Sequence, residues 1–201
     1  MVLPGSGVNV SNFPMRFVKN TPRITLLFIG RLMKDKGIEE LLEASKILIN
    51  KFENIDFKFI GFTDDWDERK ILEFTKDDRI VYLGEQEDVR PFISETSAII
   101  HPSYHEGLSN VLLEGAAMGR PLLASNIPGC KEIIDDGVNG FLFEPRSSDA
   151  IVEAVEKFMA LSFEERQEMG RKSREKVERE FDRQIVVDAY MKEIKRILEE
   201  N

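Results

Sequence analysis

The chain has 201 residues, of which 42% are hydrophobic and 32% are charged, and its formal net charge is -9 at pH 7. This length allows one domain with a buried core, whereas the acidic balance argues against nucleic acid as a main partner, because nucleic-acid binding needs a basic face. The single cysteine leaves no intrachain disulfide, and no apolar run reaches the roughly 18–20 residues that cross a bilayer.

Residues 1–22 are rich in Gly, Pro, Asn and Ser, and they predict a linker or lead-in before a domain over residues 23–201. These residues lack the charged start and the apolar stretch of a signal peptide, and the lone cysteine fits a reducing compartment. We therefore expect a cytoplasmic protein.

From residue 24 onward, short apolar runs alternate with longer amphipathic patterns. The apolar runs predict strands over residues 24–30, 55–61, 79–84, 98–103, 121–125 and 139–145. The amphipathic patterns predict helices over residues 37–50, 64–76, 87–96 and 109–119, followed by three helical pieces from about residue 149 to the end. Asp64 suits the N-cap of the second helix, and Pro91 suits the first turn of the third.

Strand-helix alternation of this kind predicts the α/β class: a doubly wound, mostly parallel six-stranded Rossmann-like sheet with helices on both faces and a helical C-terminal tail. Ligands of such sheets bind beyond the carboxyl ends of the strands, where the strand order switches. The loops after the first and fourth strands, GRLMKDKG and HPSYHEGLSN, are therefore expected to form the site.

Two cations bracket the first of these loops. Arg31 offers a planar fork and Lys36 a compact charge, a common pairing for a diphosphate. The alternative is two ordinary surface cations, although a helix start disfavours positive charge.

The second loop combines a helix start with two glutamates. Ser109 suits an N-cap, so the amides of Gly107, Leu108 and Ser109 would point out of the helix and form an anion site. Gly107 permits a close ligand approach. Glu114 lies about a turn and a half into the helix among apolar neighbours, so its carboxylate needs donors such as ribose hydroxyls. Glu106 precedes the turn and would reach beyond the phosphates. The alternative for both glutamates is exposed surface charge.

These residues lie in stretches that resemble the carboxyl-terminal domain of group 1 glycosyltransferases, the retaining two-domain enzymes of the GT-B fold. The two glutamates with seven residues between them are that family's signature, and the sequence around them is similar to that of bacterial capsule and O-antigen transferases. The matching stretches span most of the chain: GSGVN, GRLMKDKGIEELLEA, FIG, VYLG, HPSYHEGLSNVLLEGAAMGRPLLAS and IPGCKEIIDDGVNGFLFEP.

The resemblance implies a role for each matching position. Arg31 and Lys36 match the family's diphosphate-binding arginine and lysine, and Glu106 matches the glutamate that contacts the donor sugar; these three form the catalytic set. The donor-binding set consists of Gly30, of Leu83 and Gly84 beside the base, of Gly107, Leu108 and Ser109 near the diphosphate and sugar, and of Glu114 on the ribose.

The resemblance also implies a UDP-sugar donor, no cofactor, no metal ion and front-face displacement with retention. The implied acceptor is a glycan or a lipid-linked sugar at the inner face of the membrane. The family's amino-terminal acceptor domain is absent from this chain, so we expect turnover to need that domain or a partner subunit. Any peripheral membrane contact would then occur through the missing half.

Three further patterns suggest other chemistry. Asp65 and Asp67 have the Asp-x-Asp spacing of metal-dependent transferases, but they open a predicted helix, where acidic residues are common. His101 and His105 are expected at a strand end and in a loop, which suits a zinc pair poorly. We expect a structural role for His101, whereas His105 is a candidate donor to a phosphate or sugar.

Other functions would make different demands on the same residues. A nicotinamide dehydrogenase would need Gly-x-Gly-x-x-Gly after the first strand, and GRLMKDKG lacks it. A nucleotide-sugar epimerase of related fold would use a similar pocket but would turn over without an acceptor. A non-catalytic donor-binding or regulatory subunit would bind the same nucleotide and leave catalysis to a second chain.

Overall fold

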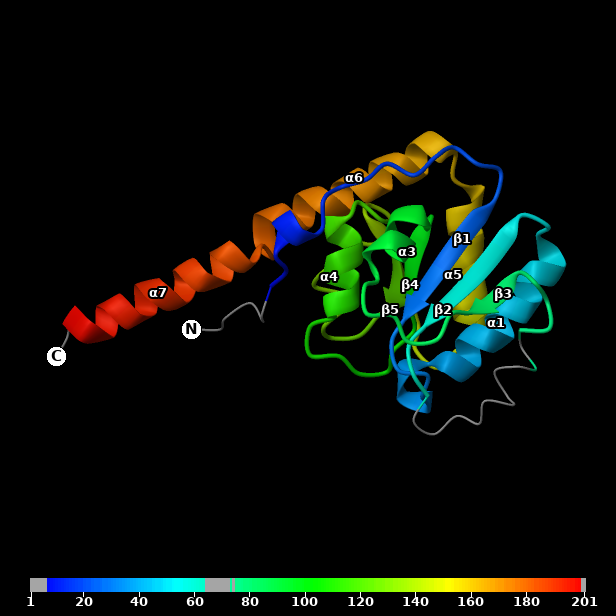
Figure 1. Ribbon diagram of the computed structural model, residues 1–201, viewed down its shortest axis with the longest axis horizontal. Helices are drawn as coiled ribbons and strands as arrows, with labels where there is room; N and C mark the ends of the chain where they lie inside the picture. The colour runs from blue at the N-terminus through cyan, green and yellow to red at the C-terminus, as the bar shows by residue number, and fades with distance from the viewer. Residues whose placement is uncertain (1–6, 64–72, 74, 200–201) are drawn as a thin grey trace.

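The computed structural model describes residues 7–63, 73 and 75–199. Six strands form one sheet in the order β3-β2-β1-β4-β5-β6, and every neighbouring pair is parallel (Figure 1). The predicted fold class is therefore confirmed, with a sheet that is wholly parallel. The strands are β1 (Ile24–Ile29), β2 (Ile55–Ile60), β3 (Ile80–Tyr82), β4 (Ala98–His101), β5 (Leu122–Ser125) and β6 (Gly140–Phe143).

The helices follow the predicted order, and the tail consists of three pieces as expected. The helix predicted over residues 64–76, with its Asp64 cap and the Asp65–Asp67 pair, lies almost wholly outside the described residues. The described helices are η1 (Val10–Asn12), η2 (Lys34–Lys36), α1 (Ile38–Lys51), α3 (Arg90–Glu95), α4 (Asn110–Ala117), α5 (Ser148–Ala160), α6 (Phe163–Glu180) and α7 (Arg183–Glu199). Helix α3 is shorter than predicted, and Pro91 lies in its first turn.

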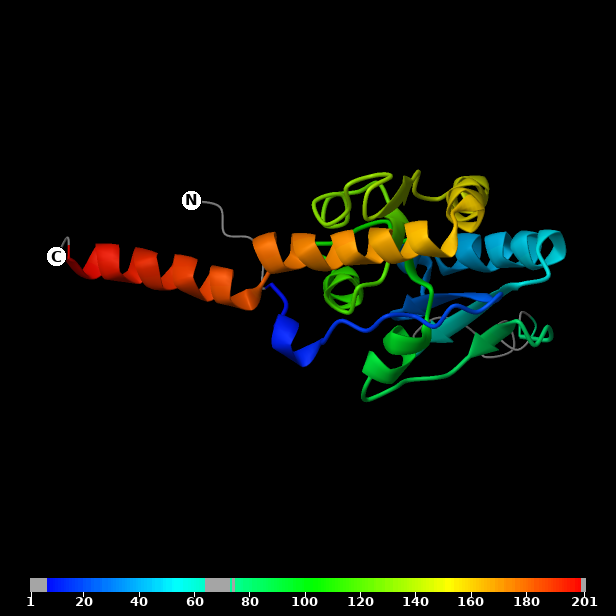
Figure 2. The same cartoon turned by 90° about the horizontal axis from the view of Figure 1, so that it is seen from above.

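Two core clusters lie on opposite faces of the sheet, because side chains alternate along each strand. The first core cluster packs under α1 and α5 and takes Leu26 and Phe28 from β1. The second core cluster packs under α3 and α4 and takes Leu27 and Ile29 from the same strand. Figure 2 shows α1 and α5 on one side of the sheet and α3 and α4 on the other, so the sheet is doubly wound.

The lead-in packs on the domain. The Val8 amide donates to the Phe181 carbonyl at 2.9 Å, and the Arg183 amide donates to the Val8 carbonyl at 2.9 Å. Val8 is therefore bonded to the junction of α6 and α7 through both of its backbone groups. Val8 is also buried in the second core cluster. The segment that follows runs along the amino ends of the strands before it enters β1 (Figure 1).

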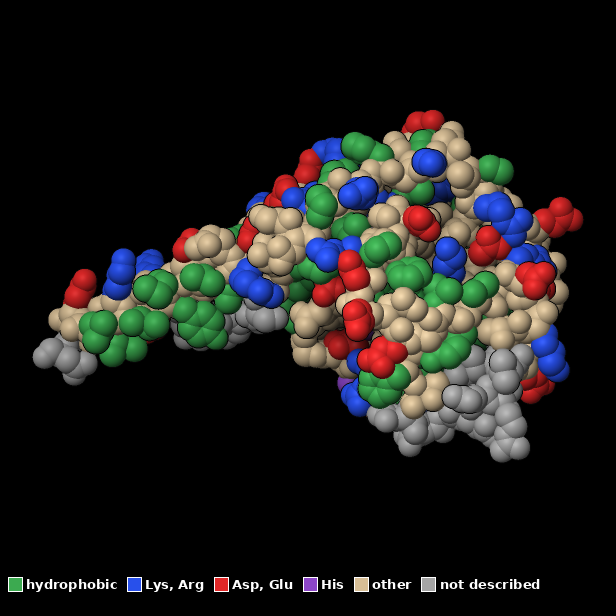
Figure 3. All heavy atoms as spheres, viewed as in Figure 1, with side chains coloured by type: hydrophobic (Ala, Val, Ile, Leu, Met, Phe, Trp, Pro, Cys, Tyr) green, Lys and Arg blue, Asp and Glu red, His purple; other side chains and the backbone are tan. Residues whose placement is uncertain are grey.

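Helix α7 projects away from this body (Figure 1). Val186 is its one buried residue among those described. Figure 3 shows hydrophobic side chains along the projecting helix, and the exposed ones are Ile185, Val187, Tyr190, Met191, Ile194, Ile197 and Leu198. In the described part of the chain, no helix combines the length and the apolar character needed to cross a membrane.

Candidate functional site

The loops after β1 and β4 meet at the carboxyl edge of the sheet. These strands are neighbours, and the connections from them lead away in opposite directions, which makes this edge the switch point of the sheet. Gly37 ends the first loop with φ +67°, and a Cβ on it would lie 2.1 Å from the Pro102 carbonyl oxygen. The Tyr104 amide donates to the Asp35 carbonyl at 2.9 Å. The two expected loops are therefore locked together.

A tyrosine extends this lock to α1. The Tyr104 hydroxyl donates to Glu40 Oε1 at 2.5 Å, and the Arg146 guanidinium lies 4.7 Å from the centre of the Tyr104 ring. Burial, together with the bond to Glu40, raises the pKa of Tyr104 above its ordinary value, so the hydroxyl stays a donor at neutral pH. The second loop is thus anchored to the helix that follows the first.

The catalytic pair predicted from separate loops is in direct contact. Lys36 Nζ lies 2.5 Å from Glu106 Oε1, and the two side chains are 22% and 14% exposed. His101, the last residue of β4, brings its Nε2 to 2.8 Å from the same oxygen. A half-buried carboxylate therefore holds two donors on one oxygen.

This arrangement keeps Glu106 ionised. Burial alone would raise the pKa of Glu106, but the hydrogen bonds from His101 and Lys36 outweigh it and lower the pKa to about 2. The Ser103 hydroxyl acts in the same direction. At neutral pH the group is an acceptor only, suited to a ligand hydroxyl or ammonium.

The helix start behaves as predicted, with one difference. Ser109 is the N-cap of α4, and its hydroxyl accepts from the Leu112 amide at 3.4 Å. Its own amide, however, donates to the Gly129 carbonyl at 3.1 Å. The expectation that this amide faces an anion is therefore wrong, because its N–H already donates to the Gly129 carbonyl. Among the described residues, the amides of Gly107 and Leu108 have no such partner.

The fold does not explain why residue 107 is a glycine. A Cβ on Gly107 would meet no atom within 4 Å, and its φ lies outside the left-handed region. Neither packing nor backbone conformation within the described chain therefore requires glycine there. Close approach of another molecule is the remaining physical use of a missing side chain.

Glu114 faces an apolar setting. Its neighbours Leu112, Leu113, Ala116 and Ala117 are buried, as the sequence predicts. Burial raises the pKa of the Glu114 carboxyl. Within the described chain no hydrogen bond reaches that carboxylate, so it is a half-buried acceptor that a ligand's hydroxyls would suit.

The other predicted positions lie along the same edge. Gly30 ends β1, and its amide donates to the Ile60 carbonyl at 2.9 Å, while Arg31 follows as an exposed side chain. Beyond β3, the Leu83 amide donates to the Phe59 carbonyl, and the Gly84 carbonyl accepts from Gly61. The site residues thus share one edge, with Lys36 and Glu106 in contact.

Sequence reasoning missed the partners of Glu106 and Tyr104. His101 was given a structural role, yet its ring contacts Glu106, and Glu40 was not singled out. No spacing rule links Glu40 to Tyr104, because they lie on different elements. For His101 the signal was its place at the end of β4, directly before the second loop.

The residues of the site do not form a metal centre in the described part of the chain. Among the described residues, no three His, Cys, Asp or Glu side chains gather as metal ligands. His105 is exposed, whereas His101 is buried on Glu106. Cys130 is buried, and burial raises its thiol pKa to about 12, so it is a poor nucleophile.

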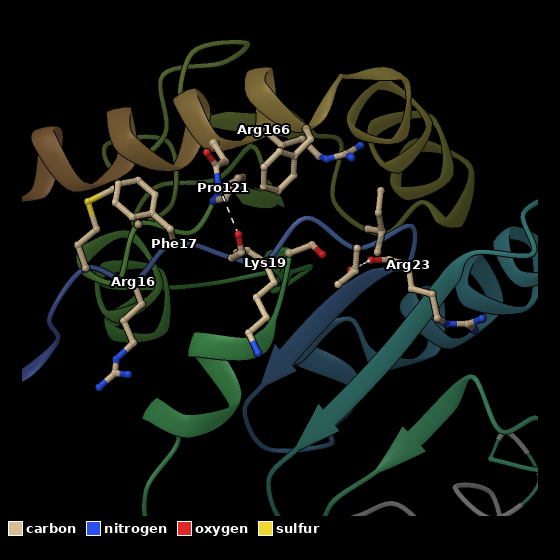
Figure 4. Close-up of a pocket in the computed structure, with 14 residues that line it drawn as sticks. Arg16, Phe17, Lys19, Arg23, Pro121 and Arg166 are labelled. Carbon is tan, nitrogen blue, oxygen red and sulfur yellow. Dashed lines mark hydrogen bonds between the residues drawn. The ribbon is translucent and has the colours of Figure 1, made fainter.

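A small pocket lies at the opposite end of the sheet, beside the segment before β1. Figure 4 shows it between that segment and α6, with Phe17 and Pro121 among its lining residues and Gln167 bonded to the Val18 carbonyl at 3.4 Å. The space around it, including the part that is open to solvent, is about 480 Å³. Because it lies at the amino ends of the strands, it is separate from the two loops described above.

Three comparisons bear on this geometry. A family model described as "Glycosyl transferases group 1" matches residues 11–176. The capsular polysaccharide biosynthesis glycosyltransferase CapM of Staphylococcus aureus is 30% identical over 162 residues, which are 79% of this chain and 42% of CapM. The chain spans about half the length of the curated relatives it matches.

Solved structures share the fold. Sucrose-phosphate synthase of Thermosynechococcus elongatus superposes with a TM-score of 0.83 at 21% identity, over 97% of this chain and 52% of that one. Anabaena HepE, solved in complex with UDP and glucose, superposes with a TM-score of 0.79 at 16% identity, over 94% of this chain and 55% of that one.

Proposed function

The chain belongs to the group 1 glycosyltransferases, and on that premise we propose that it binds the nucleotide-sugar donor of a bacterial hexosyltransferase. The proposed reaction moves a hexose from UDP to a glycan or lipid-linked acceptor, with retention at the anomeric carbon, during surface-polysaccharide synthesis. The observation that carries this proposal is the contact of Lys36 with Glu106 across the two loops of the switch edge. It joins a cation suited to a phosphate to a carboxylate suited to a sugar hydroxyl.

Lys36 and Arg31 are the proposed ligands of the diphosphate. Both lie in the loop after β1, and the amides of Gly107 and Leu108 at the start of α4 add neutral donors nearby. A charge-assisted hydrogen bond contributes roughly 1.5–3 kcal/mol, against about 0.3–1 kcal/mol for a helix dipole. The two cations therefore set the affinity for the diphosphate, and the helix start sets its position.

Glu114 is the proposed ligand of the ribose. Its carboxylate is buried enough to raise its pKa and has no hydrogen bond from the described chain, so two vicinal hydroxyls would satisfy it. Leu83 and Gly84, beyond β3, are the proposed main-chain neighbours of the base. A Cβ on Gly84 would meet no atom within 4 Å, which leaves room for a ring there.

Glu106 is the proposed contact of the donor sugar. As the bond from the anomeric carbon to the diphosphate breaks, its electron pair goes to the leaving oxygen. The acceptor hydroxyl bonds to the anomeric carbon from the same face and gives its proton to the departing diphosphate. Arg31, Lys36 and the start of α4 stabilise the charge that grows on the diphosphate. The proposed reaction uses no cofactor and no metal ion.

Turnover is proposed to need more than these residues. The chain spans about half the length of CapM, so the acceptor site is proposed to lie in another domain or subunit, in the cytoplasm and at the inner face of the membrane. A non-catalytic donor-binding subunit would give the same nucleotide affinity. It would be recognised by the absence of transfer after the second half is supplied.

Calorimetric titration with UDP, GDP and ADP tests the proposal. We expect saturable binding of UDP, weaker binding of the other two, and no effect of EDTA. Arg31→Ala and Lys36→Ala should weaken UDP binding by about 1.5–3 kcal/mol each and spare uridine. Lys34→Ala, on the same loop, is the matched control. Equal losses for UDP and uridine would remove the diphosphate role, and no binding of any nucleotide would contradict the proposed function.

A further inference from the structure

His101 is a buried residue of the site to which the proposed function assigns no role. Its side chain is 3% exposed, its Nε2 lies 2.8 Å from Glu106 Oε1, and the same nitrogen lies 3.3 Å from Ser109 Oγ. Among the described residues its Nδ1 is buried without a hydrogen-bond partner. Buried polar atoms are nearly always paired, so an orphan nitrogen marks a ring held in place for its other nitrogen.

The chemistry of the neighbour decides where the ring proton lies. An ionised carboxylate only accepts hydrogen bonds, so Nε2 must be the donor. In the neutral ring, Nδ1 is then a buried acceptor with no hydrogen-bond partner among the described residues. The opposite tautomer would place a lone pair against the carboxylate and a buried N–H against no acceptor.

Two donors share one oxygen of Glu106, and they differ in mobility. Lys36 Nζ sits at the end of a flexible side chain that is 22% exposed, whereas His101 is rigid and buried at the end of β4. Neither of them contacts Oε2. A diphosphate that takes up the Lys36 ammonium would therefore leave His101 as the donor on Oε1.

We infer that His101 is the positioning residue of the site: it holds Glu106 Oε1 when the donor diphosphate draws Lys36 away, so that Oε2 stays directed to the sugar. This inference rests on the proposed function for its ligand, and on the described contacts for its geometry. It explains why one oxygen carries both donors, since the second donor keeps the carboxylate ordered after the first has moved.

The titration of the Glu106 carboxyl, followed by ¹³C NMR with and without saturating UDP, tests this role. Two variants are compared with the wild type: His101→Leu, which removes the donor, and His101→Gln, whose amide N–H replaces Nε2–H. We expect the wild-type carboxyl to titrate at low pH without UDP and somewhat higher with it, because Lys36 no longer donates to Glu106. With UDP bound, the carboxyl of His101→Leu should titrate about one pH unit or more above that of the wild type, and His101→Gln should restore the wild-type value.

Histidine ¹⁵N spectra add a readout that needs no ligand. The chain has two histidines, so the buried His101 is assigned against the exposed His105. We expect the proton on Nε2 of His101, and its signal should persist when UDP is added. A proton on Nδ1, or a Glu106 titration that is unchanged in His101→Leu in both states, would overturn the inference.

The outcomes separate the two proposals. If the wild type fails to bind UDP, the proposed function fails, and the ligand-free titration still decides whether His101 holds Glu106. If UDP binds and His101→Leu leaves the Glu106 titration unchanged, the positioning role fails while the proposed function stands.

Discussion

The Glu114 carboxylate combines a cost to folding with a use in binding. Its burial raises its pKa, so the folded chain disfavours the charge that the group carries at neutral pH. We expect Glu114→Gln to raise the free energy of unfolding at pH 7, because it removes this charge at nearly constant shape. The gain should vanish below the pKa of the unfolded chain, where Glu114 is protonated in both states.

The same substitution should weaken UDP binding by about 1.5–3 kcal/mol, since a charged acceptor for the ribose is lost. Urea denaturation and calorimetry on one preparation measure both effects. The assignment would be contradicted if the free energy of unfolding and the affinity for UDP both rose or both fell. A merely structural glutamate would not separate stability from affinity.

Gly107 allows a complementary test. A methyl group at this position meets no atom of the described chain, and the backbone there lies outside the left-handed region. We therefore expect Gly107→Ala to leave the free energy of unfolding unchanged or about 0.4–1 kcal/mol higher, through a less flexible unfolded chain. UDP binding should fall at least tenfold if a phosphate approaches the backbone here. Unchanged affinity with unchanged stability would remove that role.

Glu106 gives the site a dependence on acid. Its folded pKa of about 2 lies below the ordinary glutamate value of 4.5, so its stabilising effect is fully present above about pH 4.5 and is lost as the pH falls towards 2. The shift corresponds to about 3 kcal/mol. We expect Glu106→Gln to lower the free energy of unfolding by that order at pH 7, and the difference from the wild type to shrink in acid. Urea denaturation between pH 7 and pH 3 measures this, with the exposed Glu144 changed to Gln as control.

The contact between the loops after β1 and β4 leaves no room for a side chain at Gly37. Gly37 and Gly84 share the same left-handed φ of +67°, but a Cβ on Gly37 would overlap the Pro102 carbonyl, whereas one on Gly84 would meet nothing within 4 Å. Gly84→Ala should therefore cost only the backbone strain, about 1–2 kcal/mol. Gly37→Ala should cost clearly more, about 3–4 kcal/mol, because the loops must separate.

Urea denaturation of the two variants measures this difference directly. Equal costs would mean that the lock between the loops contributes nothing. The lock also sets the distance between Lys36 and Glu106, so Gly37→Ala should disturb nucleotide binding even where the chain remains folded.

Most of the elements could be predicted, because their signals are local. The run ITLLFI is buried on both faces and became β1, and Ser109 carries the side chain that an N-cap needs. One detail was beyond such rules. Helix α3 begins only at Arg90, later than its sequence pattern predicts.

The site was predicted as a set of positions but not as a set of contacts. Switch-point topology predicts Arg31, Lys36 and Glu106 at one edge, and it did not predict that Lys36 and Glu106 touch. The bond from the Ser109 amide to Gly129 and the orphan nitrogen of His101 depend on residues far apart in the chain. Periodicity and capping rules describe neighbours in sequence, so they carry no information on such pairs.

Helix α7 dominates the exposed apolar surface of the protein. Val187, Tyr190, Met191, Ile194 and Leu198 follow the spacing of one helical face, and all of them are exposed. We expect the double change Ile194→Glu and Leu198→Glu to reduce the binding of a hydrophobic dye such as ANS. The free energy of unfolding should change by less than about 0.5 kcal/mol, because neither side chain is buried.

Val186 is the matched control on the same helix, since it is buried. Val186→Glu should lower the free energy of unfolding by about 2 kcal/mol or more, because a charge enters the core. A similar loss in the double variant would mean that the exposed face of α7 is packed in solution.

The hydrogen bonds of Val8 to Phe181 and Arg183 constrain the order in which the protein folds during its synthesis. Val8 precedes the first strand of the sheet and its hydrogen-bond partners follow the last one, so this contact forms only after the whole sheet has been synthesised. Val8 and Phe181 both belong to the second core cluster, which is therefore completed late. A nascent chain that stalls before Arg183 would lack one of the two hydrogen bonds that hold Val8 on the second core cluster, and apolar side chains left exposed in this way favour aggregation.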